Sequence, residues 1–153
     1  MASVRSKALA YLQIAIAGMR IDDGYAYDWQ NAYTRVRNVA DFKGYPSCNI
    51  TDGGQNYGTD PALCLSRVWS IRIDAAHKVT EENQTDGQTV ADNLLSDLEL
   101  LVGNDSKLGG LVLDVRPSSA ITRLPTSTEP WVVASLTVEI LYRTAYGDPS
   151  QPK

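Results

Sequence analysis

The sequence predicts an α+β fold: a mostly antiparallel sheet with two amphipathic helices packed on one face. Two observations support this fold class. Apolar residues recur at helical spacing in two segments, whereas other segments alternate apolar and polar residues as half-buried strands do. The elements also follow the order helix, strands, helix, two strands, which is typical of helices that cover one face of an antiparallel sheet.

The first predicted helix begins after Ser3, whose hydroxyl suits an N-cap, and extends to about Gly18–Met19. Its apolar stripe is formed by Leu9, Leu12, Ile16 and Met19, with Ala8 and Ala15 beside them. The basic start and apolar middle of this segment resemble a signal peptide. The interruption at Gln13 and the helical stripe favour a folded helix over an export signal.

Two strands and a long loop are predicted next. Asn31–Val39 has the composition of a strand, and Leu65–Ala75 alternates cleanly. One face of the second strand contains Leu65, Arg67, Trp69, Ile71, Ile73 and Ala75. Between the two strands, residues 40–64 lose periodicity and are rich in glycine and proline. We expect a long loop there, and loops of this length are usually functional or disordered.

A second helix is predicted to start at Thr85-Asp86 and to end at Gly103, in the left-handed conformation that glycine favours. Its apolar stripe is formed by Val90, Leu94, Leu98 and Leu101. The polar residues predicted to lie mainly on the opposite side are Asp92, Asn93, Asp97 and Glu99.

A hairpin follows, with strands at Leu111–Arg116 and Trp131–Arg143 and a connection over 117–130 whose first part, Ser119–Arg123, extends the pairing. The tail, residues 147–153, is predicted to lie outside the sheet because its two prolines lack ladder donors. Residues 1–153 therefore read as one domain with a long loop at 40–64 and an extended C-terminal tail.

Composition excludes several functional classes. The 153 residues carry a net charge of −4, with a pI near 4.9, which disfavours a general nucleic-acid binder. No apolar run reaches the ~20 residues that a bilayer span requires, so we expect no membrane association. Cys48, Cys64 and His77 are too few for a zinc site, and the two cysteines are read as reduced thiols rather than as a disulfide.

No reactive constellation is recognisable. The sequence has no nucleophile elbow, Walker loop, dinucleotide fingerprint or His-Glu-x-x-His motif. His77 is expected to be a solvated strand-end histidine, and Gly53–Gly58 a flexible loop rather than a phosphate cradle. We therefore predict no enzyme activity, no catalytic residue, no cofactor and no metal.

An aromatic cluster contains Tyr25, Tyr27, Trp29 and Tyr33. It suits a stacking platform for bases or sugars, or a strand face packed on the core or on a partner subunit, and the second interpretation is favoured. Arginines are spread over all the predicted strands. Such a spread favours solvated sheet edges or inter-subunit pairs over a nucleic-acid stripe.

The segment from Val90 to Thr144 carries a resemblance to a known family. A leucine-rich acidic helix leads into Leu108-Gly109-Gly110 and a strand, and a long connection leads to Val138-Glu139-Ile140-Leu141-Tyr142-Arg143. This pattern resembles the tail-terminator, or tail-completion, proteins of tailed bacteriophages, in which a leucine-glycine-glycine turn precedes a hairpin ending in such a strand. The segment from residue 25 to residue 63 is longer than that family's pattern.

The resemblance implies a structural virion protein at the tail–neck junction, made in the host bacterial cytoplasm. Its copies would form a ring, expected from the family to be a hexamer, that caps the tail tube and stops its polymerisation. The implied partners are the tail tube protein and the head–tail connector or stopper, and double-stranded DNA would pass through the lumen without sequence-specific binding. The alternatives are another neck component, a tail tube protein or, in a different class, a small-molecule or carbohydrate-binding α+β module.

Inter-subunit or tube contacts are expected in the loop at 41–63, the connection at 117–130 and the tail. The residues predicted to make them are Tyr25, Tyr27, Trp29, Arg35, Arg37, Arg123, Glu129, Trp131, Tyr146, Asp148, Pro149 and Lys153.

Overall fold

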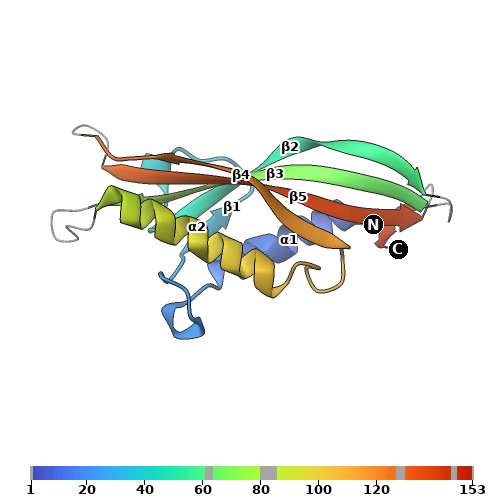
Figure 1. Cartoon of the computed structure of the whole chain (residues 1–153), viewed down its shortest axis with the longest axis horizontal. Helices are drawn as coiled ribbons and strands as arrows, with labels where there is room; N and C mark the ends of the chain where they lie inside the picture. Colours follow the sequence, from blue (N-terminus) through green and yellow to red (C-terminus); the bar gives the residue numbers. More distant parts are fainter. Residues whose placement is uncertain (1, 61–63, 80–85, 127–129, 146–147, 153) are drawn as a thin grey trace.

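The computed structural model describes residues 2–60, 64–79, 86–126, 130–145 and 148–152, and it confirms the predicted α+β class (Figure 1). The elements are α1 (Val4–Ala17), β1 (Asn31–Tyr33), β2 (Ser47–Asp60), β3 (Cys64–Lys78), α2 (Gly87–Asn104), β4 (Asp114–Arg123), β5 (Trp131–Ala145) and β6 (Asp148–Pro152). The sheet has the order β1-β2-β3-β5-β4, and β6 pairs with β5. Both helices lie on the same side of the sheet, so one face is covered and the other is open.

The centre of the sheet is the long antiparallel pair of β3 and β5. The register runs from Cys64 opposite Ala145 to Lys78 opposite Trp131. The predicted alternation is confirmed, because one face of each strand is buried against the helices. These residues are Arg67, Trp69, Ile71, Ile73 and Ala75 of β3, and Val132, Ala134, Leu136, Val138, Ile140 and Tyr142 of β5.

Helix α1 begins where the sequence predicts. The Ser3 hydroxyl accepts a hydrogen bond from the Ser6 backbone N–H at 3.1 Å, which satisfies one of the orphan donors of the first turn. The side chains buried along one stripe are Val4, Ala8, Leu12 and Ile16. The helix therefore packs lengthwise on the covered face of the sheet.

Helix α2 ends later along the chain than predicted. Asp86 caps it by accepting from the Gln88 N–H at 3.2 Å, but the helix continues through Gly103 and ends at Asn104. The left-handed backbone lies further on, at Leu108, Gly109 and Gly110, with φ values of 47°, 67° and 88°. The glycines that permit the reversal are thus those of the turn before β4, not Gly103.

The predicted long loop at 40–64 is wrong in its second half. Residues 47–60 form β2, which pairs antiparallel with β3 from Ser47 opposite Ala76 to Asp60 opposite Cys64. The register shifts between Asp52 and Gly54, and a β-carbon on Gly53 would lie 3.0 Å from the Ser70 backbone oxygen. Glycines that look like loop residues are here the residues of a β-bulge.

Three other boundaries also differ from the prediction. The expected strand at 31–39 shrinks to β1, which runs parallel to the start of β2 and stops after Tyr33. The hairpin strand β4 starts at Asp114 and, as expected, continues past Pro117 to Arg123. The tail was predicted to leave the sheet, yet β6 pairs with β5, with Ala145 opposite Asp148. Proline is tolerated there because β6 is short and at an edge.

Candidate interface

A buried carboxylate holds the predicted aromatic cluster against α2. Asp97 is only 3% exposed, and its carboxylate accepts hydrogen bonds from the Ala26 N–H at 2.7 Å, the Tyr27 N–H at 3.3 Å and the Trp29 indole N–H at 2.9 Å. The expectation that Asp97 faces solvent is wrong, because it sits beside Leu98 on the buried side of the helix. This carboxylate replaces water for three donors in a segment with no regular structure.

Burial corrects the contact role predicted for Trp29, whereas the same role for Tyr25 and Tyr27 stays a prediction. Trp29 is fully buried and belongs to the core, whereas Tyr25 and Tyr27 are half-buried and pack against it. Of the two interpretations left open by the sequence, packing on the core holds for Trp29. A stacking platform for bases or sugars would need exposed rings, so the described geometry does not support one.

His77 is not the solvated strand-end residue that we expected. Its ring packs edge-on against Tyr27, with ring centroids 4.8 Å apart, and its Nδ1 atom has no hydrogen-bond partner within the described part of the chain. Burial lowers the pKa of His77 below its usual value of 6.5. Burial likewise raises the pKa of the Tyr27 hydroxyl.

The segment between β1 and β2 folds over one end of the open face. Phe42 lies between the rings of Tyr33 and Tyr45, at centroid distances of 5.3 and 6.1 Å. The Tyr45 hydroxyl accepts a hydrogen bond from the Trp131 indole N–H at 3.2 Å. Trp131, predicted as a contact residue, is therefore half-buried, and its indole N–H is hydrogen-bonded within the chain.

The other predicted contact residues fall into three groups. Arg35, Arg37, Arg123 and Pro149 are exposed. Asp148 is half-buried, and it accepts from the Ser150 N–H at 3.0 Å and the Ser150 hydroxyl at 2.6 Å. Three further predicted residues, Glu129, Tyr146 and Lys153, lie outside the described residues.

The rest of the open face combines apolar and charged side chains in a shallow groove of about 410 Å³. The residues that line it are Val39, Asn49, Arg72, Asp74, Ile121, Arg123, Val133 and Ser135. Ile121 is 73% exposed, an unusual position for a large aliphatic side chain in a strand. Arg72 pairs with Asp74, and Ser135 donates to the same carboxylate at 2.5 Å.

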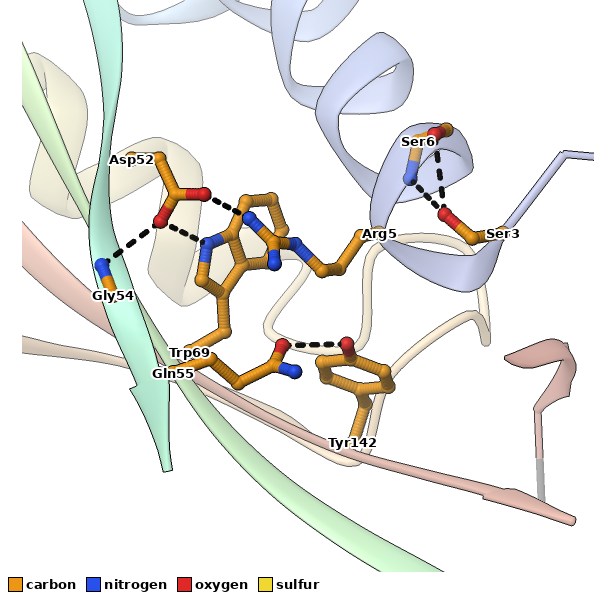
Figure 2. Close-up of polar contacts among 8 residues, drawn as sticks. All are labelled: Ser3, Arg5, Ser6, Asp52, Gly54, Gln55, Trp69 and Tyr142. Atoms are coloured by element: carbon orange, nitrogen blue, oxygen red, sulfur yellow. Dashed lines mark hydrogen bonds and ion pairs between the residues drawn. The ribbon is translucent and has the colours of Figure 1, made fainter. Parts of the chain in front are cut away.

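A second groove lies on the covered side, between α1 and β2 (Figure 2). Arg5 reaches from α1 to an ion pair with Asp52 of β2, and its guanidinium lies 4.6 Å from the centre of the Trp69 ring. Asp52 also accepts from the Gly54 N–H at 2.8 Å and the Trp69 indole N–H at 3.0 Å. These contacts, the Gly54 bond first, hold the pKa of Asp52 below its usual value.

Beyond the groove, a second set of side-chain contacts lies along β2. The Tyr142 hydroxyl donates to the Gln55 side-chain oxygen at 2.7 Å, and the Arg67 guanidinium lies 5.4 Å from the Tyr142 ring centre. Arg67 also lies 5.7 Å from the ring of Tyr57, which is 65% exposed. The Arg67 guanidinium thus lies within cation–π distance of two tyrosine rings.

Two long strand edges have no partner within the part of the chain that the structure describes. β1 covers β2 only from Ser47 to Asn49, so the outer edge of β2 is open from Ile50 onward. β4 pairs with β5 on one side, and its other edge is open. Unpaired edges expose a row of N–H and C=O groups that can pair with another chain.

The described residues hold little reactive chemistry. They contain no group of three or more His, Cys, Asp or Glu side chains arranged to hold a metal ion. Cys48 is a buried free thiol, and burial raises its pKa, so its reactive thiolate is disfavoured. Over the same ranges, no helix has the length and apolar character needed to cross a bilayer.

The sequence matches no protein-family model and no curated protein. Sequence reasoning missed the groove beside α1 and the free edge of β2. One pattern could have indicated that strand: Cys48 and Ile50 share a face, and Gln55 and Tyr57 share one after the two glycines.

Proposed function

We propose that this chain is a structural virion protein, a bacteriophage tail terminator. Its copies assemble into a hexameric ring that caps the tail tube, stops its polymerisation and offers the surface on which the DNA-filled head docks through its connector or stopper. The observation that carries the proposal is a single sheet whose one face and two long edges are left without a partner in the described residues. Surfaces of this kind suit association rather than catalysis.

The residues of the resemblance support the proposal through their structural roles. Leu108, Gly109 and Gly110 form the left-handed turn that connects α2 to β4. In β5, Tyr142 is buried in the core while Glu139 is exposed on the open face. The motif therefore encodes one turn and one strand with a core side and a free side.

A ring follows from these surfaces if copies associate head to tail. Such contacts join two different patches of the same chain, and they close into a ring when the rotation between neighbours divides the circle. The free edges of β2 and β4 are two different patches on opposite sides of the sheet. A ring built in this way needs no cofactor and leaves a lumen through which DNA passes without base contacts.

The mass of the purified protein tests this proposal. Native mass spectrometry, with and without tail tube protein, should show a species of six times the 16.7 kDa chain, and negative-stain images should show rings at tube ends. Added to polymerising tube protein, the chain should limit tube growth. A protein that stays monomeric beside tube protein would overturn the proposal.

One observation favours a second candidate, a small-molecule-binding module. The groove between α1 and β2 has a volume of about 420 Å³, within the size range of ligand sites, and is lined by Arg5, Asp52 and Trp69 among others. A monomer that binds a small ligand there would identify this function. Within the first class, a ring that incorporates along the tube instead of capping it would identify a tube protein.

A further inference from the structure

We propose that the copies join edge to edge: β4 of one copy adds as a strand to the free edge of β2 in the next. The added strand lies in the groove that α1 forms beside that edge. This inference rests on the proposed ring, and it names the surfaces that build it. Addition of a strand to an exposed sheet edge is an established mode of protein recognition.

The receiving edge begins where β1 stops. Tyr33 is opposite Asn49, and Thr34, the next residue, already lines the groove together with Thr51 and Asp52. The groove therefore occupies the place that a longer β1 would have filled. From Thr51 to Gly58, β2 has β3 on one side and no described strand on the other.

The groove offers an added strand both polar and apolar contacts. Its floor includes Ile50, Trp69 and Ile71, which are buried, and its rim includes Ser3, Ser6 and Thr34. Side chains on one face of an added strand would pack toward α1, while the backbone would pair with β2. Arg5 and Asp52 already neutralise each other, so the groove does not call for a charged ligand.

The donated strand is β4, whose outer edge is exposed along most of its length. Every residue from Arg116 to Arg123 is exposed, including Ile121 at 73%. β4 contains 10 residues, close to the 11 residues of β2, Ile50–Asp60, that lie beyond its contact with β1. Arg123 of β4 is exposed, whereas Arg116 is paired with Asp114 of the same strand.

Strand direction favours this pairing over others. β2, β3, β5 and β4 are successively antiparallel, so the two outer strands of this group run in opposite directions. A second copy placed beside the first in the same orientation brings β4 next to β2 as an antiparallel pair. The alternation of the sheet then continues from copy to copy without a break.

The offset between the two edges favours closure. The open part of β2 is level with β5 from Thr137 to Ala145, whereas β4 is level with β5 from Val133 to Leu141. Sheets joined with such an offset are sheared, and closing a sheet on itself requires both shear and twist. Edge pairing thus predicts a closed ring rather than a flat ribbon.

Variants that each carry one introduced cysteine, mixed in pairs, test the inference. In a Cys64→Ser background, Asn56→Cys marks β2, and Ser119→Cys or Ile121→Cys marks β4 at two positions, so that a slip in register cannot hide the contact. All three sites face the open side of the sheet, because they lie opposite Val68, Thr137 and Ser135. Cys64→Ser alone, with only the buried Cys48, is the blank, and Ser96→Cys on the exposed side of α2 is the matched control.

The variants are assembled singly and as mixtures, treated with a short bismaleimide, and analysed for cross-linked dimers and for ring mass. The mixture of β2 and β4 variants should cross-link roughly a hundredfold faster than the Ser96→Cys control, because paired edges hold the thiols at millimolar effective concentration.

Cross-links between identical variants would overturn the inference in favour of a two-fold pairing. Rings without cross-links above the control would overturn it while leaving the proposed function intact. Absence of rings in every variant and in the parent chain would overturn both.

Discussion

The two faces of the sheet are completed in different ways. Between the helices and the sheet lie large, fully buried side chains, among them Leu12 of α1, Leu94 of α2 and Ile140 of β5. The opposite face exposes Ile121 and Arg72, and among the described residues it is covered at one end, where Tyr45 meets Trp131. Folding therefore depends on the covered face, which leaves the open face and the free edges available for association.

The largest expected effect is on the covered face. Ile140→Ala should lower the free energy of unfolding by about 3–4 kcal/mol, because it leaves a cavity in the centre of the sheet. Ile121→Ala on the open face should change it by less than about 0.5 kcal/mol. Urea denaturation of both variants measures the difference. Equal losses would show that the open face is buried within the folded chain.

The next effect concerns the carboxylate under the aromatic cluster. Asp97→Ala should cost about 3 kcal/mol, because the Trp29 indole N–H and two backbone N–H groups lose their acceptor. Glu99→Ala, an exposed acid on the same helix, is the control and should be nearly neutral. Unfolding of both variants is followed by tryptophan fluorescence. Equal free energies of unfolding for the two variants would contradict a structural role for Asp97.

A smaller effect separates two glycines of β2. Gly54 has a φ of +104°, so Gly54→Ala should destabilise the chain by about 1–2 kcal/mol. Gly58 lacks a positive φ, and a β-carbon there would meet only the Ser66 β-carbon at 4.0 Å, so Gly58→Ala should be close to neutral. Thermal unfolding compares the pair. Identical melting temperatures would contradict the bulge.

The smallest expected effect is a dependence of the free energy of unfolding on pH, caused by the titration of His77. The pKa of His77 is lowered by burial, so the unfolded chain takes up a proton first as the pH falls below about 6.5. Stability is therefore complete above that pH and decreases as the pH falls toward the folded pKa. His77→Gln should flatten the profile between pH 7 and pH 5.

The carboxylates act in a different window. The pKa values of Asp52 and Asp148 are lowered from 3.8, so their stabilisation is present above that pH and is lost only in stronger acid. An unchanged profile between pH 7 and pH 5 in the His77→Gln variant would show that another group titrates there.

The covered face could be predicted from the sequence because burial on one side leaves a pattern. The alternation of Trp69, Ile71 and Ile73 follows directly from packing under α1 and α2. The strand β2 could not be predicted in the same way. Its backbone pairs with β3 through the bulge at Gly53 and Gly54, and glycine at a bulge is indistinguishable in sequence from glycine in a loop.

The predicted contact residues lie only in part on the surface. Arg35, Arg37 and Arg123 are exposed as expected, but Trp29 is buried. An aspartate on a helix normally indicates a solvent-exposed position. Only the tertiary structure reveals that Asp97 accepts hydrogen bonds from a segment about 70 residues away. The free strand edges could not be predicted either, because they depend on the order of the strands in the sheet, and no local sequence pattern determines that order.

The most direct test of the account is hydrogen–deuterium exchange of the assembled protein compared with the dissociated chain. Backbone amides of β2 from Thr51 to Gly58 and of β4 from Ser118 to Arg123 should gain protection on assembly, while those of the buried β3 and β5 should change little. An assembled ring in which both edges exchange as fast as in the dissociated chain would contradict the claim that the free edges build it.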